Sequence, residues 1–249
     1  MAPATRQGVM ETVRRVGASL VRRIVDFALP PRCAGCGTVI DQPDGFCGEC
    51  WPRIDWLDAG GCARCGIPLQ ATEMDRCARC LTTPPAIART RAAMAYGDIA
   101  RSLVLKLKYG RKVALARTMA RYMEPHAGLD GETILVPVPL HRARLWQRGF
   151  NQSLLIARHL ARRSRATVLG GAMARRRRTR PLKGMSASQR AREVGGAFAV
   201  RDPGGVKGKR VVLVDDVLTS GSTSEACARA LLKAGAARVE LICFARVVR

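Results

Sequence analysis

The clearest pattern of apolar positions is the run Val211 to Val214, which contains no polar residue and is followed by two acids. A run without polar alternation is typical of a strand buried on both faces, as in a parallel α/β sheet. Helical periodicity over residues 103–123 and 154–160 falls between other apolar segments. Strands that alternate with helices predict an α/β fold with a mostly parallel, doubly wound sheet. The further strands are expected near residues 92–96, 133–138, 166–169, 198–200 and 238–244.

Two acids and a small hydroxylated loop follow the apolar run. Asp215 and Asp216 fall at the carboxyl end of the predicted strand, where open α/β sheets bind their ligands. Residues 219–223 combine hydroxyl side chains, a glycine and backbone N–H groups at the start of a helix, which is the chemistry of an anion site. Ser222 and Glu225 fit a capping box at that helix start. Carboxylates beside a phosphate cradle predict a ribose phosphate as the ligand.

A second strand, loop and helix start are expected at residues 136–153. Backbone N–H groups of this loop and Arg148 are candidates for binding another phosphate group. The prolines of this segment fit a second interpretation equally well, in which they only end the strand. The basic segment 175–198 is typical of a lid or a binding loop, but also of a solvated charged surface.

Eight of the ten cysteines form four Cys-x-x-Cys pairs. Each half of the set has the ligand number and spacing of a tetrahedral zinc site without an open position, so the zinc is expected to be structural. A disulfide framework and a redox dithiol are the alternatives, but disulfides are uncommon in the reducing cytosol that we expect for this chain. Pairing within each half is favoured over an interleaved arrangement, which the spacing also permits. The predicted ligands of two Zn²⁺ ions are Cys33, Cys36, Cys47, Cys50, Cys62, Cys65, Cys77 and Cys80, and the separate Cys227 and Cys243 are expected to be buried.

The composition predicts a strongly basic protein. Lys and Arg number 43 against 19 Asp and Glu, which gives a formal net charge of +24. A polyanionic partner fits this charge, and so does a solvated arginine-rich surface. No apolar run reaches the roughly 18 residues of a membrane span, and charges interrupt the N-terminal stretch too often for a signal peptide, so a cytoplasmic protein is expected.

Three parts are expected along the chain. Residues 1–28 fit a basic amphipathic segment, which we expect to dock on the protein itself rather than on a membrane. Residues 29–82 form the predicted double zinc ribbon, and residues 86–249 form the predicted sheet domain. The segment Thr82 to Pro85 is a plausible hinge between the last two parts.

The segment Val211 to Thr223 resembles the signature for 5-phosphoribosyl-1-pyrophosphate (PRPP) of type I phosphoribosyltransferases. Over roughly residues 28–247 the chain is similar to the ComF family. This resemblance implies a type I phosphoribosyltransferase-like sheet flanked by helices, preceded by a tandem zinc-ribbon module. It also depends on the cysteine module, Leu107-Lys-Tyr-Gly110, Val136-Pro-Val-Pro-Leu-His141, Arg148-Gly-Phe-Asn-Gln152 and residues 179–198.

The resemblance implies roles for particular residues. Asp215 and Asp216 are expected to bind the ribose hydroxyls, directly or through Mg²⁺, and Arg190 to contact the pyrophosphate from a lid; these three are the expected catalytic residues of an enzyme. Leu182 and Glu193 depart from the family's usual Gln and Asn in that lid, so ligand binding is a firmer expectation than turnover. The implied PRPP site comprises Asp215, Asp216, Thr219, Ser220, Gly221, Ser222 and Thr223, with a pyrophosphate loop of Pro139, Leu140, His141 and Arg148.

The family resemblance also implies a role in natural transformation. It favours a cytoplasmic protein that binds PRPP or a nucleotide and serves the uptake or processing of single-stranded DNA, with a competence helicase as a candidate partner. Two other interpretations stay open. One is a genuine phosphoribosyltransferase of nucleotide salvage, which transfers a pentosyl group from PRPP. The other is a non-catalytic scaffold that binds DNA or a protein partner. No motif dictates the acceptor base or the number of subunits.

Overall fold

The structure is a computed structural model that describes residues 30–57, 61–69, 74–177, 189 and 195–248. The chain forms two compact units, Met1–Trp51 and Pro52–Arg249. The described part of the smaller unit consists of turns around cysteines, with one isolated β-bridge between Arg32 and Val39. The predicted amphipathic segment, residues 1–28, lies outside the described residues.

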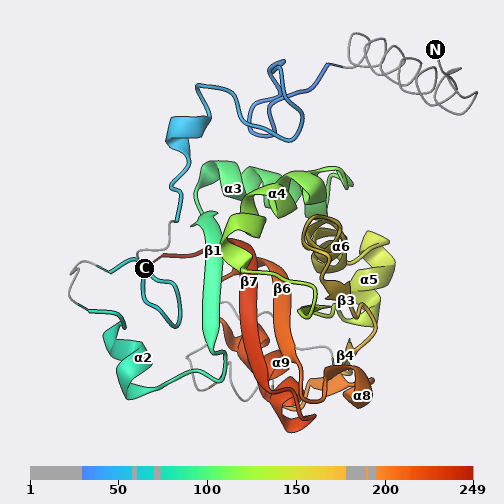
Figure 1. Cartoon of the computed structure of the whole chain (residues 1–249). Coiled ribbons are helices and arrows are strands. Elements are labelled where there is room, and N and C mark those ends of the chain that lie inside the picture. The colour runs from blue at the N-terminus through green and yellow to red at the C-terminus, as the bar shows by residue number, and fades with distance from the viewer. Residues whose placement is uncertain (1–29, 58–60, 70–73, 178–188, 190–194, 249) are drawn as a thin grey trace, which may run out of the picture. The chain divides into compact units, whose positions relative to one another are not determined.

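A parallel sheet forms the centre of the larger unit (Figure 1). Five strands lie in the order β1-β7-β6-β2-β3, and all neighbouring pairs are parallel. Residues Val211 to Val214 are buried within β6, which confirms the expectation from their uninterrupted apolar pattern. The strands are β1 (Arg89–Ala95), β2 (Ile134–Pro137), β3 (Thr167–Val168), β6 (Arg210–Leu218) and β7 (Arg238–Arg246).

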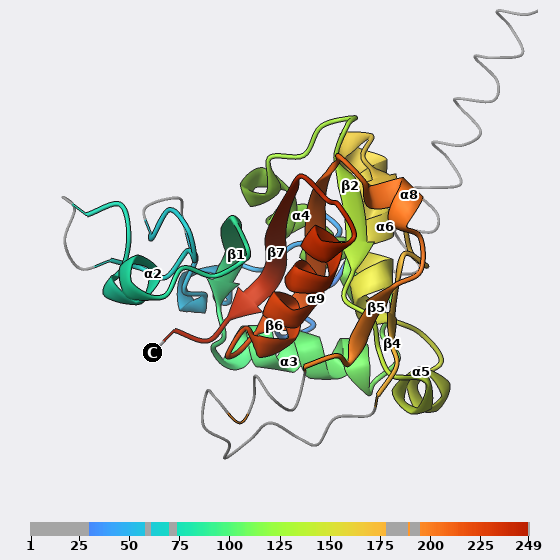
Figure 2. The ribbon, with the colours of Figure 1, turned by 90° about the horizontal axis from the view of Figure 1, so that it is seen from below.

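Helices cover both faces of the sheet (Figure 2). Helices α4 (Leu115–Ala127) and α6 (Gln152–Ser164) pack on one face, and α9 (Ser222–Lys233) packs on the other. Because side chains alternate along a strand, Val211 and Leu213 share a core with α9. Cys227 of α9 and Cys243 of β7 are fully buried, as expected. The remaining helices are η1 (Trp51–Arg53), α2 (Ala78–Thr82), α3 (Asp98–Lys108), α5 (Arg142–Arg148) and α8 (Pro203–Val206).

The helical pattern predicted over residues 103–123 forms two helices, α3 and α4. The chain turns at Gly110, where an added Cβ would lie 2.8 Å from the carbonyl oxygen of Lys106. Arg111 then takes a left-handed conformation with φ of 51°. Val113, which fitted the apolar pattern, is exposed in the connection. This tight turn ends α3 at Lys108. The apolar periodicity of the sequence does not reveal the turn.

The strand predicted near residues 198–200 forms outside the main sheet. β5 (Phe198–Val200) pairs antiparallel with β4 (Met173–Arg175) in a separate two-stranded sheet.

The start of α9 differs from the predicted capping box. Gly221 occupies the N-cap position, so Ser222 is the first helical residue, and no side chain caps the helix. The Glu225 carboxylate instead accepts a hydrogen bond of 2.8 Å from the backbone N–H of Ala86. The capping-box prediction is therefore wrong, because a residue distant in the sequence recruits the acid that the local pattern assigned to the cap.

Candidate functional site

The candidate ligand site lies where the order of the strands reverses. From β2 the chain passes through α6 to β3 on one side, and from β6 it passes through α9 to β7 on the other. Open α/β sheets bind ligands at such a switch point. Pairing of β2 with β6 ends at Pro137 and Val214, whereas β6 continues beside β7 as far as Leu218. A cavity of about 320 Å³ lies at these carboxyl ends.

The predicted phosphate loop lines this cavity. Gly221, with φ of 78°, turns the chain from β6 into α9, and an added Cβ there would meet only Leu218 Cδ1, at 3.6 Å. Among the described residues, no group accepts a hydrogen bond from the backbone N–H groups of residues 219–224. These donors therefore point to an anion site at the N-terminus of α9. The loop residues that border the cavity are Thr219, Ser220, Gly221, Ser222 and Thr223.

Both acids line the same cavity and are held by residues at the start of α6. Asp215 Oδ1 accepts hydrogen bonds from Ser153 Oγ at 3.0 Å and from the backbone N–H of Asp216 at 2.9 Å. Asp216 is only 2% exposed, and its Oδ1 accepts a hydrogen bond of 3.3 Å from Gln152 Nε2. The ammonium group of Lys108 lies 2.5 Å from Asp216 Oδ2. The two carboxylates thus sit in unequal surroundings, because the lysine contacts Asp216.

Burial changes the acidity of Asp215. Burial raises the pKa of its carboxyl from the ordinary 3.8 to about 7, and the neighbouring charge of Asp216 acts in the same direction. Lys108 and the hydrogen-bond donors oppose the rise without cancelling it. Near neutral pH, Asp215 is therefore able to exist in both protonation states.

The predicted pyrophosphate loop is divided by the structure. Pro139 and Leu140 line the cavity. His141 caps α5, because its Nδ1 accepts a hydrogen bond of 3.3 Å from the backbone N–H of Ala143. Arg148 donates to Gln152 Oε1 at 2.5 Å, and its guanidinium lies 5.5 Å from the centre of the Tyr109 ring. In this structure Arg148 organises the glutamine that holds Asp216.

Three cationic residues of the cavity are not among the predicted site residues, although Arg175 begins the basic segment 175–198 that is typical of a lid or a binding loop. Lys108, Arg144 and Arg175 all border the cavity. Lys108 belongs to the segment Leu107-Lys-Tyr-Gly110, and this segment was the only signal that pointed toward it. Arg144 and Arg175 lie in α5 and β4, and only tertiary packing brings them together. Arg190, Leu182 and Glu193 lie outside the described residues.

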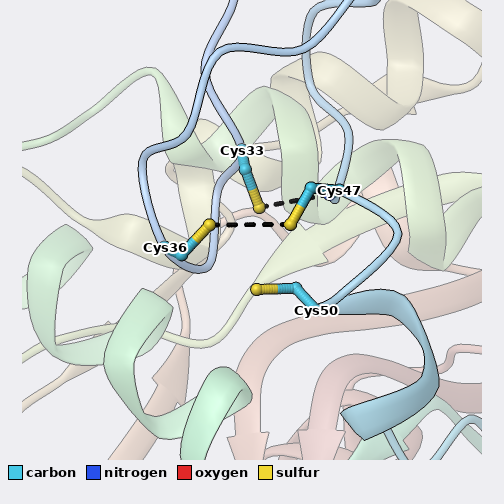
Figure 3. Close-up of side chains that lie close together, drawn as sticks. All are labelled: Cys33, Cys36, Cys47 and Cys50. Carbon is cyan, nitrogen blue, oxygen red and sulfur yellow. Dashed lines mark hydrogen bonds between the residues drawn. The ribbon is translucent and has the colours of Figure 1, made fainter.

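The cysteines gather into two sets of four, of which Figure 3 shows Cys33, Cys36, Cys47 and Cys50. Each set comes from one half of the module, and the Sγ atoms of a set lie within 4.8 Å of one another. Sγ–Sγ distances are 3.6 Å between Cys36 and Cys47 and 3.7 Å between Cys65 and Cys77. A tetrahedral site with Zn–S bonds of about 2.3 Å requires sulfur separations of about 3.8 Å. Both sets therefore fit Zn²⁺, and the predicted pairing within each half is confirmed.

Hydrogen bonds to sulfur are repeated in the two cysteine sets. Cys33 Sγ accepts from the N–H of Cys47 at 3.2 Å, and Cys62 Sγ accepts from the N–H of Cys77 at 3.4 Å. A hydrogen bond to the Thr38 hydroxyl is the main cause that lowers the pKa of Cys36 to about 6. Burial alone would raise the pKa of Cys62, but backbone N–H donors lower it to about 6. Because zinc binds thiolates, the hydrogen bonds to Cys36 and Cys62 favour the metal, whereas burial raises the pKa of Cys50, Cys65 and Cys80 in the same sets.

The second cysteine set is fixed to the edge of the sheet. The N–H of Thr90 in β1 donates to the carbonyl of Arg64 at 2.7 Å, and Arg246 at the end of β7 donates to the carbonyl of Cys65. A Cβ added at Gly66 would lie 2.6 Å from the carbonyl oxygen of Thr90. This close approach couples the metal site to β1.

Comparison with known proteins agrees with this architecture. Residues 24–81 match the double zinc ribbon domain, and residues 151–247 match the phosphoribosyl transferase domain. The chain is 35% identical to the DNA utilization protein YhgH of Escherichia coli (strain K12), over 82% of this chain and 91% of that protein. It is 28% identical to Competence protein F of Haemophilus influenzae, over 86% of this chain and 96% of that protein. Identity to Competence protein ComFC of Bacillus subtilis is 24%, over 79% and 82% of the two chains.

Fold, pocket and cysteine sets together define a phosphoribosyltransferase-like protein with a double zinc ribbon. Its similarity to the proteins named above is extensive enough to assign the chain to a family. The chain belongs to the ComF family, with the DNA utilization and competence proteins named above as its relatives.

Among the described residues, no helix combines the length and the apolar character that crossing a membrane requires.

Proposed function

We propose that the cavity binds PRPP or a nucleotide through its ribose 5-phosphate. The observation that carries this proposal is the convergence, in one cavity, of two carboxylates with the backbone N–H groups of residues 219–224. The N–H groups supply the chemistry that a 5-phosphate requires, and Asp215 supplies an acceptor for a ribose hydroxyl. Arg144 and Arg175 add positive charge for a second phosphate group.

We further propose that the protein acts in the cytoplasm during natural transformation, in the uptake or processing of single-stranded DNA. Support comes from its relatives, one named for DNA utilization and others for competence. The formal charge of +24 suits a polyanionic partner. A competence helicase is the protein partner that this role favours. Binding of the sugar phosphate is proposed to control the role in DNA uptake or to form part of it.

A matched pair of glycine substitutions tests ligand binding. Gly221→Ala places a side chain on a left-handed residue of the phosphate loop, at a strain of about 1–2 kcal/mol. We expect its affinity for PRPP, measured by calorimetry with Mg²⁺ present, to fall at least about tenfold. Gly208→Ala is the control, because Gly208 has φ of 70°, open space around it and no place in the cavity wall. Equal PRPP affinity in the two variants would rule out the loop as the phosphate site.

The role in transformation is tested in a naturally transformable host that carries the gene. We expect Asp215→Asn with Asp216→Asn to abolish PRPP binding and to lower transformation frequency, whereas Gly208→Ala leaves both unchanged. Zinc content of the purified variants checks that the protein is intact. Normal transformation by the double variant would show that sugar-phosphate binding has no part in DNA uptake.

A transferase is the second candidate function. Loss of pyrophosphate from PRPP leaves positive charge on the ribose, which nearby carboxylates stabilise while cations hold the leaving group. The cavity brings Asp215 and Asp216 close to Arg144 and Arg175, and this grouping favours the candidate. Release of pyrophosphate from PRPP, assayed across purine and pyrimidine bases, tests it. A protein that binds PRPP but releases no pyrophosphate with any base would be a sensor or scaffold.

A further inference from the structure

Lys108 reaches the acids of the cavity from the last residue of α3. Its ammonium nitrogen lies 2.5 Å from Asp216 Oδ2, and the two side chains are 21% and 3% exposed. Lys108 also lines the cavity, together with both acids. Its ammonium supplies positive charge next to Asp216, where a metal ion would otherwise supply it.

The carboxylate oxygens leave little room for a metal ion. Asp215 Oδ1 accepts two hydrogen bonds, Asp216 Oδ1 accepts one from Gln152, and Asp216 Oδ2 contacts Lys108. Among the described residues, only Asp215 Oδ2 has no hydrogen-bond or ion-pair partner within the acid pair. Mg²⁺ demands oxygen ligands in near-ideal octahedral geometry. As arranged, the pair does not fit a metal bridged by both carboxylates.

Neighbouring contacts keep the lysine in this position. Leu107 before it is fully buried, and Gly110 after it packs against the carbonyl of Lys106. Tyr109 lies under the guanidinium of Arg148, which in turn holds Gln152 against Asp216. The end of α3 and the start of α6 are thus joined through the same acid, so Lys108 is part of an ordered constellation rather than a mobile surface charge.

We infer that Lys108 takes the place of a divalent cation at Asp216, so that the sugar of a ribose phosphate binds beside the acids without a bridging metal. This inference rests on the proposed function and narrows it. An ammonium group has three N–H donors, and one contact to Asp216 leaves others for a ribose hydroxyl or a phosphate oxygen. Mg²⁺ then has its role at the pyrophosphate of PRPP, away from Asp216.

Ribose 5-phosphate is the probe that separates these two positions, because it lacks the pyrophosphate. Its binding is measured by calorimetry in buffer freed of metal by a chelating resin, which avoids stripping the zinc sites, and again with Mg²⁺. We expect the wild-type protein to bind equally in both buffers. Lys108→Gln keeps a hydrogen-bond donor for Asp216 but removes the charge, and we expect it to bind at least about tenfold more weakly without metal. Lys108→Arg restores the charge and should recover most of the affinity.

The results separate a failure of this inference from a failure of the proposed function. A wild-type protein that requires Mg²⁺ for ribose 5-phosphate, or a Lys108→Gln variant that equals wild type without metal, would overturn the inference. Wild-type protein that ignores the probe in both buffers and also ignores PRPP would instead overturn the proposed function. Mn²⁺ binding followed by electron paramagnetic resonance gives a readout that a purely structural lysine would not change. We expect no Mn²⁺ site at the acids of the wild type and a new one in Lys108→Gln.

Discussion

The acids Asp215 and Asp216 are adjacent in the sequence but differ in the groups that contact their carboxylates. Asp216 has a lysine ammonium and a glutamine amide as partners, whereas Asp215 has a serine hydroxyl and one backbone N–H. Burial, and after it the neighbouring charge of Asp216, raise the pKa of Asp215 to about 7, so both protonation states of Asp215 occur near neutral pH.

The raised pKa predicts a pH-dependent stability. Folded Asp215 holds its proton up to about pH 7, whereas its ordinary pKa is 3.8, so the folded protein binds more protons between these values. Stability from this group is complete below the lower value and is lost as the pH rises through the upper one. Asp215→Asn imitates the protonated acid. Its advantage in unfolding free energy over wild type should grow from pH 4 to about pH 7, measured by chemical denaturation. A difference that does not change with pH would contradict the assignment.

The second zinc site is joined to the strand β1 by backbone hydrogen bonds. Residues 55–57 lie antiparallel to β1, with hydrogen bonds from Leu57 to Ala93 and from Ala95 to Asp55 of 3.0 and 2.8 Å. The loop at Arg64 pairs with Thr90 of the same strand. These contacts cover a sheet edge that would otherwise present unpaired backbone groups to solvent. The module therefore stabilises the edge of the sheet.

Two glycines test this coupling. Gly66→Ala carries left-handed strain and places Cβ 2.6 Å from Thr90, which adds an overlap cost of about 1–3 kcal/mol. We expect it to shift unfolding of the sheet, followed by circular dichroism, to lower denaturant. Gly37→Ala, with φ of 88° and open space, lies in the other unit and carries strain alone. An equal effect of both variants on the sheet would contradict the coupling.

The two cysteine sets lie in different compact units of the chain. Cys33, Cys36, Cys47 and Cys50 belong to Met1–Trp51, and the second set belongs to Pro52–Arg249. Our expected domain boundaries, residues 29–82 and 86–249, stay a prediction. Since a four-cysteine zinc site contributes directly to folding, each ion is expected to stabilise its own unit.

Elemental analysis of reduced protein checks the metal content. We expect two zinc ions per chain in the wild type, as the two cysteine sets indicate, and the loss of one ion in Cys36→Ser or in Cys65→Ser. Only Cys65→Ser should also lower the thermal stability of the sheet, because loss of the metal frees the loop whose backbone carbonyl at Cys65 accepts a hydrogen bond from Arg246 of β7. Loss of both ions on a single substitution would contradict independent sites.

The local chemistry of this protein follows from short segments of its sequence. The buried strand, the adjacent acids, the phosphate loop and two four-cysteine sites follow from residue order, because each depends on groups only a few positions apart. The failed capping box marks the limit of such reasoning, since Glu225 found its partner at Ala86, far away in the chain. The predicted phosphate contact of Arg148 stays untested, although the structure directs that side chain to Gln152 and Tyr109.

The cations near the acids are brought there by tertiary packing. Lys108, Arg144 and Arg175 come from α3, α5 and β4, and no periodicity or motif spacing relates them. Burial is also a property of the whole fold, so the raised pKa of Asp215 and the contact between Lys108 and Asp216 arise only in the packed structure. The order of residues supplies the acids and the phosphate loop, and tertiary packing sets the electrostatic environment around them.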